Sequence, residues 1–130
     1  MEGEDNMQPV PKVTAEDVER IVRRDFPPEQ YERVTAMLRE YGTEKWQRGE
    51  ARVRLAVLKL AAGDIKQLRY WVDISKRDYR DVLAYAEYPG YMTKVPPSEE
   101  ISAAGRQEII NQDWLQYQAW LQKNKTFLTG

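Results

Sequence analysis

The sequence contains neither cysteine nor histidine. Without cysteine, the chain has no disulfide, no thiolate zinc site and no thiol nucleophile. Without histidine, it also lacks the usual general base and the commonest ligand of transition metals. Enzymatic chemistry is therefore restricted to carboxylate, lysine, tyrosine or serine side chains. No phosphate-binding loop or metal-binding motif is present, so we assign no catalytic residue, no metal ligand and no cofactor, and we predict a protein that is not an enzyme.

Long apolar runs and an excess of one charge are also missing. The longest apolar block, residues 55–62, is interrupted by Lys59, whereas a membrane helix needs about 20 apolar residues. The chain begins MEGED, which is acidic where a secretion signal is basic. Twenty basic and twenty-one acidic side chains give a net charge of −1, which argues against general binding to nucleic acid or anionic membranes. We expect a cytoplasmic protein that does not bind membranes.

Helical periodicity is abundant, most clearly in residues 43–63. At 100° per residue, the apolar side chains of this segment cover nearly its whole circumference, which is typical of a buried helix. We predict a central helix that is capped by Thr43 and closed by Gly63. Its remaining polar strip holds four basic residues that line up along the axis: Lys45, Arg48, Arg52 and Lys59.

Apolar stripes bounded by capping residues, proline or glycine predict about five further helices. Gly42 is expected to end the helix before the central one, so barely two residues would join the pair as an αα-hairpin. Asp64 is expected to cap the helix that follows the central one. Ser75, with Asp78 three residues later, is expected to cap the helix after that. The approximate predicted ranges are 15–24, 28–41, 64–74, 75–88 and 102–123.

The remaining segments show no helical period. Residues 1–13 are predicted to form a flexible acidic tail, and residues 91–98 a surface loop, because Pro96-Pro97 favours extended backbone. No segment has the period of two that marks a strand. The prediction is one all-α domain at residues 14–130, a compact bundle of about six helices around the central one.

Residues 52–89, RVRLAVLKLAAGDIKQLRYWVDISKRDYRDVLAYAEYP, resemble a small bacterial family of helical proteins of unassigned function. The shared features are an arginine-valine start, a leucine-alanine-lysine-leucine helix, a glycine-aspartate turn and an aspartate-arginine-aspartate helix ending near proline. The resemblance covers about a third of the chain. It implies a bacterial origin and a recurring helical unit, and it supplies no catalytic residue and no ligand.

The basic strip has two interpretations. One is a groove for an anion or for nucleic acid, lined by Lys45, Arg48, Arg52 and Lys59. The other is that these long side chains reach out of a buried helix to carboxylates of adjoining helices, such as Asp78 and Asp81. We prefer the second, because the balanced net charge argues against general affinity for phosphate.

Asp78 and Asp81 themselves form a candidate site, one helical turn apart. Paired carboxylates serve acid/base catalysis or bind a divalent cation. The alternative is an ordinary solvated helix face, on which Asp78 caps the helix and Arg77 and Arg80 neutralise the charge. We prefer this alternative, because no second carboxylate pair is evident.

Aromatic residues near the C-terminus are the preferred candidates for partner binding. Tyr85, Tyr88 and Tyr91 crowd the AEYPGY turn, and they either pack on Trp71 or Trp114 or leave a ring exposed for a partner. The last helix carries Trp114 and Trp120, and Asp113 is its only charge between residues 109 and 122. Such a helix packs on its own domain or on a second copy. The function we predict is a protein-interaction module, with a possible homodimer through this helix.

Overall fold

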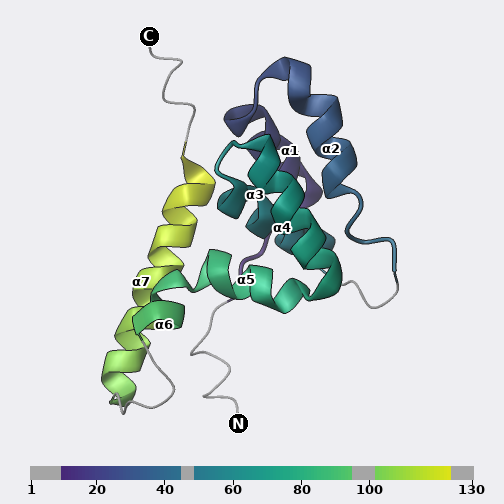
Figure 1. Cartoon of the computed structure of the whole chain (residues 1–130). Coiled ribbons are helices and arrows are strands. Elements are labelled where there is room, and N and C mark those ends of the chain that lie inside the picture. The colour runs from purple at the N-terminus through teal and green to yellow at the C-terminus, as the bar shows by residue number, and fades with distance from the viewer. Residues whose placement is uncertain (1–9, 45–48, 95–101, 124–130) are drawn as a thin grey trace.

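The computed structural model describes residues 10–44, 49–94 and 102–123 (Figure 1). All regular structure in these ranges is helical, so the prediction of an all-α bundle is confirmed. The elements are α1 (Ala15–Asp25), a 3₁₀ turn (Pro28–Gln30), α2 (Tyr31–Leu38), α3 (Glu50–Ala61), α4 (Ile65–Arg77), α5 (Tyr79–Glu87), α6 (Pro89–Lys94) and α7 (Ala103–Gln122). Figure 1 shows α7 along one side of the bundle, with the short α6 against its lower half.

The chain enters α1 through a cap at Thr14. The backbone N–H of Thr14 donates to Asp17 Oδ2 at 3.0 Å, which fixes the first turn as the sequence predicts. Just before this cap, Pro11 is buried and Val13 packs against the core. Residues 10–13 of the predicted tail therefore lie on the domain, and residues 1–9 are outside the described ranges.

The central helix is confirmed, and most of its apolar side chains are buried. α3 packs against α1, α4 and α5. Its apolar residues reach the core in every direction, because a helix wrapped by three neighbours leaves only narrow gaps for polar side chains. The buried positions are Val53, Leu55, Ala56, Val57, Leu58 and Ala61.

The predicted start of this helix and the hairpin before it are wrong. α2 ends at Leu38, and α3 begins at Glu50 rather than near Thr43. Gly49 has a φ of 62°, a left-handed conformation that a continuous helix from Thr43 to Gly63 does not contain. Arg54 also holds the turn after α2, since its guanidinium donates to Leu38 O and Tyr41 O at 3.0 and 2.6 Å.

The end of α3 has an unusual residue. Ala62 adopts the left-handed conformation at φ 52° and ψ 41°, before Gly63 with φ 80°. This conformation costs an L-residue about 1–2 kcal/mol, and glycine avoids the cost. Asp64 then caps α4, as predicted, by accepting from the backbone N–H groups of Lys66 and Gln67.

Replacing Ala62 with glycine is therefore expected to stabilise the protein. The strain relieved exceeds the extra entropy that glycine has in the unfolded chain, so the free energy of unfolding should rise by about 0.5 kcal/mol. Ala84→Gly, in the interior of α5, is the matched control and should lower it by about 1 kcal/mol. Urea unfolding followed by circular dichroism measures both, and a destabilised Ala62→Gly protein would contradict the left-handed assignment.

The boundary between α4 and α5 also differs from the prediction. α4 continues three residues past Ile74 to Arg77, and Ser75 is buried inside it. The Ser75 hydroxyl donates to Val72 O at 2.6 Å, a bond back along the helix, so it does not cap α5. Asp78 is the cap, accepting from Arg80 N at 3.1 Å.

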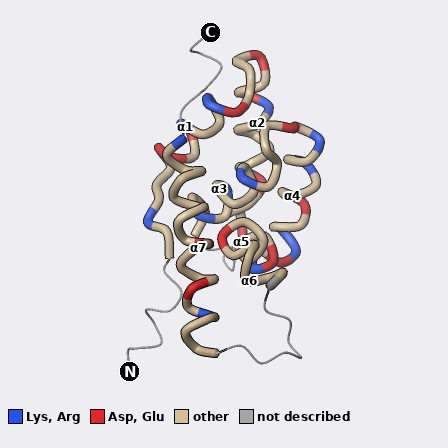
Figure 2. The backbone as a smooth tube through the Cα atoms, turned by 90° about the vertical axis from the view of Figure 1, so that its left-hand side faces the viewer, with Lys and Arg blue, Asp and Glu red and all other residues tan. Residues whose placement is uncertain are grey.

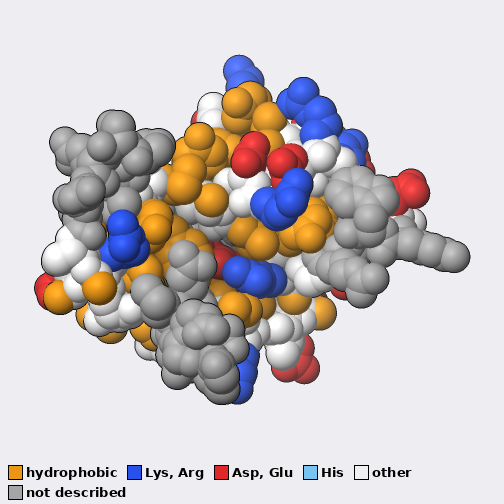
Figure 3. All heavy atoms as spheres, turned by 90° about the horizontal axis from the view of Figure 1, so that it is seen from below, with side chains coloured by type: hydrophobic (Ala, Val, Ile, Leu, Met, Phe, Trp, Pro, Cys, Tyr) orange, Lys and Arg blue, Asp and Glu red, His pale blue; other side chains and the backbone are white. Residues whose placement is uncertain are grey.

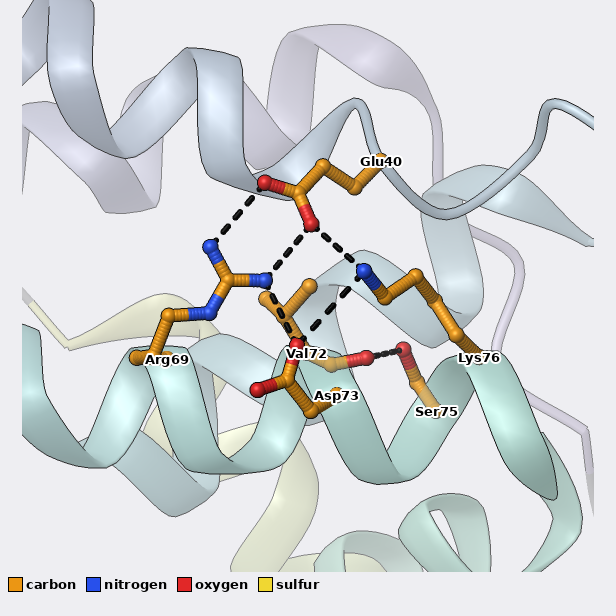
Figure 4. Close-up of polar contacts among 6 residues, drawn as sticks. All are labelled: Glu40, Arg69, Val72, Asp73, Ser75 and Lys76. Atoms are coloured by element: carbon orange, nitrogen blue, oxygen red, sulfur yellow. Dashed lines mark hydrogen bonds and ion pairs between the residues drawn. The ribbon is translucent and has the colours of Figure 1, made fainter.

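An ion-pair network joins the turn after α2 to α4 (Figure 4). Arg69 donates to both carboxylate oxygens of Glu40, at 3.0 and 2.6 Å, and Lys76 donates to the same carboxylate at 2.7 Å. Asp73 on α4 accepts a further bond from Arg69 at 2.7 Å. The hydrogen bonds from Arg69 and then Lys76 lower the pKa of Glu40 to about 2.

This network predicts how stability depends on pH. The pKa of Glu40 lies below its ordinary value of 4.5, so the stabilisation is complete above that value and is lost as the pH falls toward 2. Because the side chains of Glu40 and Lys76 are 36% exposed, solvent screening limits the effect of Glu40→Gln at pH 7 to about 1 kcal/mol. Urea unfolding at several pH values measures the difference, with Glu32→Gln on exposed α2 surface as the control. A difference that stays constant down to pH 2 would contradict the assignment.

The predicted loop after α5 is wrong in its first part. Residues 89–94 form α6, with Pro89 at its first position, where a missing N–H has no cost. Asp113 of α7 accepts from Gly90 N and Tyr91 N, both at 2.8 Å, and so caps α6 from outside the segment. Residues 95–98 are outside the described ranges. α7 begins after Ser102, whose hydroxyl caps the helix by accepting from Gly105 N at 3.0 Å.

Candidate functional site

Arg52, one of the two described residues of the basic strip, forms an ion pair within the bundle. Arg52 donates to both carboxylate oxygens of Glu87 on α5, at 2.8 and 2.7 Å. The Glu87 side chain is 3% exposed and that of Arg52 28%. The hydrogen bonds from Glu87 raise the pKa of Arg52 above its ordinary value. This pair therefore ties α3 to α5, while Lys45 and Arg48 are outside the described ranges.

Lys59, two turns further along α3, is half-buried. Burial lowers its pKa, and the nearby charge of Asp113 acts in the opposite direction. Arg52 thus reaches a carboxylate of an adjoining helix, as the preferred interpretation expected. The carboxylates named for the basic strip were wrong. Glu87 is the partner of Arg52, because Asp78 is at the far end of α5, where it caps the helix and accepts from Arg80 Nε at 3.2 Å.

The Asp78 and Asp81 pair is not joined by further acids. Asp81 is exposed, and the hydrogen bonds from Arg80 lower the pKa of Asp78. Within residues 10–44, 49–94 and 102–123, no group of three or more carboxylate, histidine or cysteine side chains is arranged to hold a metal ion. Asp78 acts as a helix cap and Asp81 lies on the solvated face.

The three candidate tyrosines occupy different environments. Tyr85 is 47% exposed, and its ring lies 6.1 Å from that of Trp71, one of the two expected packing partners. Tyr88 and Tyr91 are half-buried, and burial raises the pKa of Tyr88. Together they line a groove of about 300 Å³ between α5 and α6, with Arg80, Leu83, Ala84 and Met92. From this end of the molecule, much of the visible described surface is hydrophobic (Figure 3).

Two buried polar residues of α7 were not assigned a role from the sequence. Asp113 is 3% exposed, and its carboxylate holds the N-terminus of α6. The hydroxyl of Tyr117 is buried without a hydrogen-bond partner among the described residues, and burial raises the pKa of Tyr117. Asp113 is the only charged residue between residues 109 and 122, and this sequence feature could have indicated that its side chain binds another part of the chain.

The two tryptophans of α7 are partly covered by the chain itself. Trp114 and Trp120 are half-buried. The guanidinium of Arg24 lies 5.1 Å above the Trp120 ring and donates to Trp120 O at 2.6 Å. Arg20 donates to Leu121 O at 2.8 Å, so two arginines of α1 hold the C-terminal end of α7. Trp120 therefore serves to attach α7 to the bundle.

Past the exposed Glu108, the outward side of α7 carries no charged side chain between residues 109 and 122. We call it the α7 outer face, and Leu115, which is 61% exposed, lies at its centre. Figure 2 shows α7 as a mostly uncharged helix, in contrast to α4 with its many basic and acidic positions. The exposed residues of this face are Asn111, Gln112, Leu115, Ala119 and Gln122, and Gln118 between them is half-buried.

No family model, curated protein or solved structure matches the chain in comparisons with known proteins. The resemblance of residues 52–89 to a bacterial helical family therefore stays a prediction. Among the described helices, none combines the length and the apolar composition that are needed to cross a membrane.

Proposed function

We propose that this chain is a non-enzymatic protein-interaction module whose partner is a second copy of itself, bound through the α7 outer face. The observation that carries the proposal is the exposed surface of α7 between residues 109 and 122, which carries no charge and has Leu115 at its centre. Charged residues make up 32% of the whole chain, so their absence from this face distinguishes it from ordinary surface.

A second copy suits this surface for a simple reason. In a twofold dimer the same patch meets itself, so any charge near the axis faces an identical charge. A neutral face avoids that repulsion, and its glutamine and asparagine side chains both donate and accept hydrogen bonds. Leu115 supplies the apolar centre, and the half-buried Trp114 is its neighbour in the chain.

The groove between α5 and α6 is a second contact of the same module. Its lining of Tyr88, Tyr91, Leu83 and Met92 suits one apolar side chain of a partner, and exposed Tyr85 extends this aromatic surface. A bacterial origin and a cytoplasmic location belong to the proposal as well. The resemblance of residues 52–89 supports the first, and a chain without cysteine, which needs no oxidising compartment, fits the second. Arg52 is occupied by Glu87, so no observation favours a nucleic-acid interface at the basic strip.

Sedimentation equilibrium over a range of concentrations tests this function. We expect the apparent mass to rise with concentration toward twice that of one chain. Leu115→Glu should weaken association at least roughly tenfold, because two carboxylates would then meet across the dimer axis. Ala36→Glu places the same charge on exposed α2 surface and should leave association unchanged. A wild-type mass that stays monomeric at every concentration would contradict the proposal, as would equal association of the two variants.

A further inference from the structure

A groove lies between α1, α2 and α3, away from the surfaces discussed above. Its volume is about 510 Å³, which is within the range of small-molecule sites. One part is apolar and the other carries charged side chains, so the groove is amphipathic. The residues that line it are Ala15, Val18, Glu19, Val22, Thr35, Leu38, Arg39, Glu50, Ala51 and Arg54.

The guanidinium of Arg54 is fixed in position in this groove. Its Nε and Nη2 atoms donate to the carbonyl oxygens of Leu38 and Tyr41, which hold the group at the end of α2. Among the described residues, Arg54 forms no ion pair. Burial, together with the like charge of Arg39, lowers the pKa of Arg54, whereas Glu50 and, to a smaller extent, Tyr41 act in the opposite direction. The positive charge of Arg54 is thus fixed in position, and the nearby carboxylate of Glu50 forms no ion pair with it.

The other charged groups leave the groove with a positive surplus. Glu19 is bonded outward to Arg23 at 2.9 Å, so its charge is already engaged. Arg39 is exposed at the groove and makes no ion pair with any described residue. Arg39 and Arg54 therefore face Glu50 alone, and an anion placed between the two guanidinium groups would relieve their mutual repulsion.

We propose that this groove binds a small amphipathic carboxylate, with its apolar body on Val18, Val22 and Leu38 and its carboxylate at Arg39 and Arg54. Arginine is suited to this role because its planar fork of donors matches a carboxylate. The apolar lining supplies the driving force for burial of the ligand body, and the arginine pair selects the sign of the head group. This site is independent of the proposed dimer, because it lies on α1, α2 and α3.

Three probes with the same apolar chain separate the contribution of the apolar lining from that of the two arginines. Decanoate, decan-1-ol and decylammonium, each below its solubility or micelle limit, are titrated into the ¹⁵N-labelled full chain at pH 7. We expect decanoate to shift the amides of α1, the end of α2 and the first turn of α3, and to bind about tenfold more tightly than decan-1-ol, the difference expected for one charge-assisted contact. Decylammonium should bind more weakly still. Equal binding of all three probes, or shifts confined to the α5 and α6 groove, would overturn the proposal.

Substitution of Arg39 tests the charge recognition without disturbing a structural contact. Arg39→Gln is expected to weaken decanoate binding about tenfold and to leave decan-1-ol binding unchanged. Arg33→Gln is the matched control, because it removes the same charge from exposed surface of the same helix outside the groove. An unchanged decanoate affinity in Arg39→Gln, or an equal loss in Arg33→Gln, would overturn the assignment. Neither result bears on self-association, which is measured without a ligand.

Discussion

Replacing Arg52 with alanine is expected to lower the free energy of unfolding by about 3 kcal/mol, because it leaves a buried carboxylate without its partner. Glu87 is 3% exposed and receives both of its side-chain hydrogen bonds from Arg52. An unpaired charge at this depth costs more than the pair contributes when intact. Urea unfolding at pH 7 measures the change.

Two further variants distinguish the cost of leaving Glu87 unpaired from the cost of removing an arginine side chain. The double variant Arg52→Met with Glu87→Leu replaces both charges by apolar groups of similar size and should recover most of the stability lost in Arg52→Ala. Arg23→Ala breaks an ion pair with Glu19 in which both side chains are 63% exposed, and its effect should stay within about 0.5 kcal/mol. If Arg52→Ala were no more destabilising than Arg23→Ala, the pair between α3 and α5 would not have the role described.

The second large effect is expected from Leu58→Ala in the middle of α3. Leu58 is fully buried, and its side chain belongs to the core shared by α1, α4 and α5. Truncation removes apolar contact and leaves a cavity that neighbouring helices cannot close, so the free energy of unfolding should fall by about 3–4 kcal/mol.

Leu60→Ala is the matched control for this substitution. It makes the same chemical change two residues along the same helix, at a position that is only half-buried. Its cost should be about half as large, because part of the side chain is already in contact with water. Thermal unfolding monitored by calorimetry checks both variants. Equal effects of the two truncations would contradict the burial assigned to α3.

The sequence allowed the helices and their caps to be predicted where the signal is local. Periodicity identified α3 as buried, and Asp64 was recognised as a cap because a helix cap depends on residues that are close together in the sequence. The start of α3 was missed because Thr43 resembles a cap, whereas the left-handed backbone at Gly49 decides where the helix begins.

The partners of charged residues were less predictable, since they depend on tertiary packing. Glu87 lies on α5 whereas Arg52 lies on α3, and Asp113, which caps α6, lies on α7. Neither contact has a signature at a fixed spacing. The helical nature of residues 89–94 was missed for the same reason, because a six-residue helix is supported mainly by Asp113 and by its packing on α7.

For the candidate surfaces too, the sequence predicted local features and missed those that depend on tertiary packing. The uncharged character of α7 was visible in the sequence, but its exposed side became known only once the buried stripe was fixed by Ile110, Tyr117 and Leu121. The groove between α1, α2 and α3 was not predicted at all. It depends on how Arg54 reaches back to the end of α2.

Native-state amide hydrogen exchange tests most directly the claim that α3 is the buried centre around which the other helices pack. The amides of Val57 and Leu58 should exchange only through global unfolding, with a free energy equal to that measured in urea, while those of α6 exchange through smaller local openings. Exchange of the α3 amides as fast as those of α6 would contradict this account.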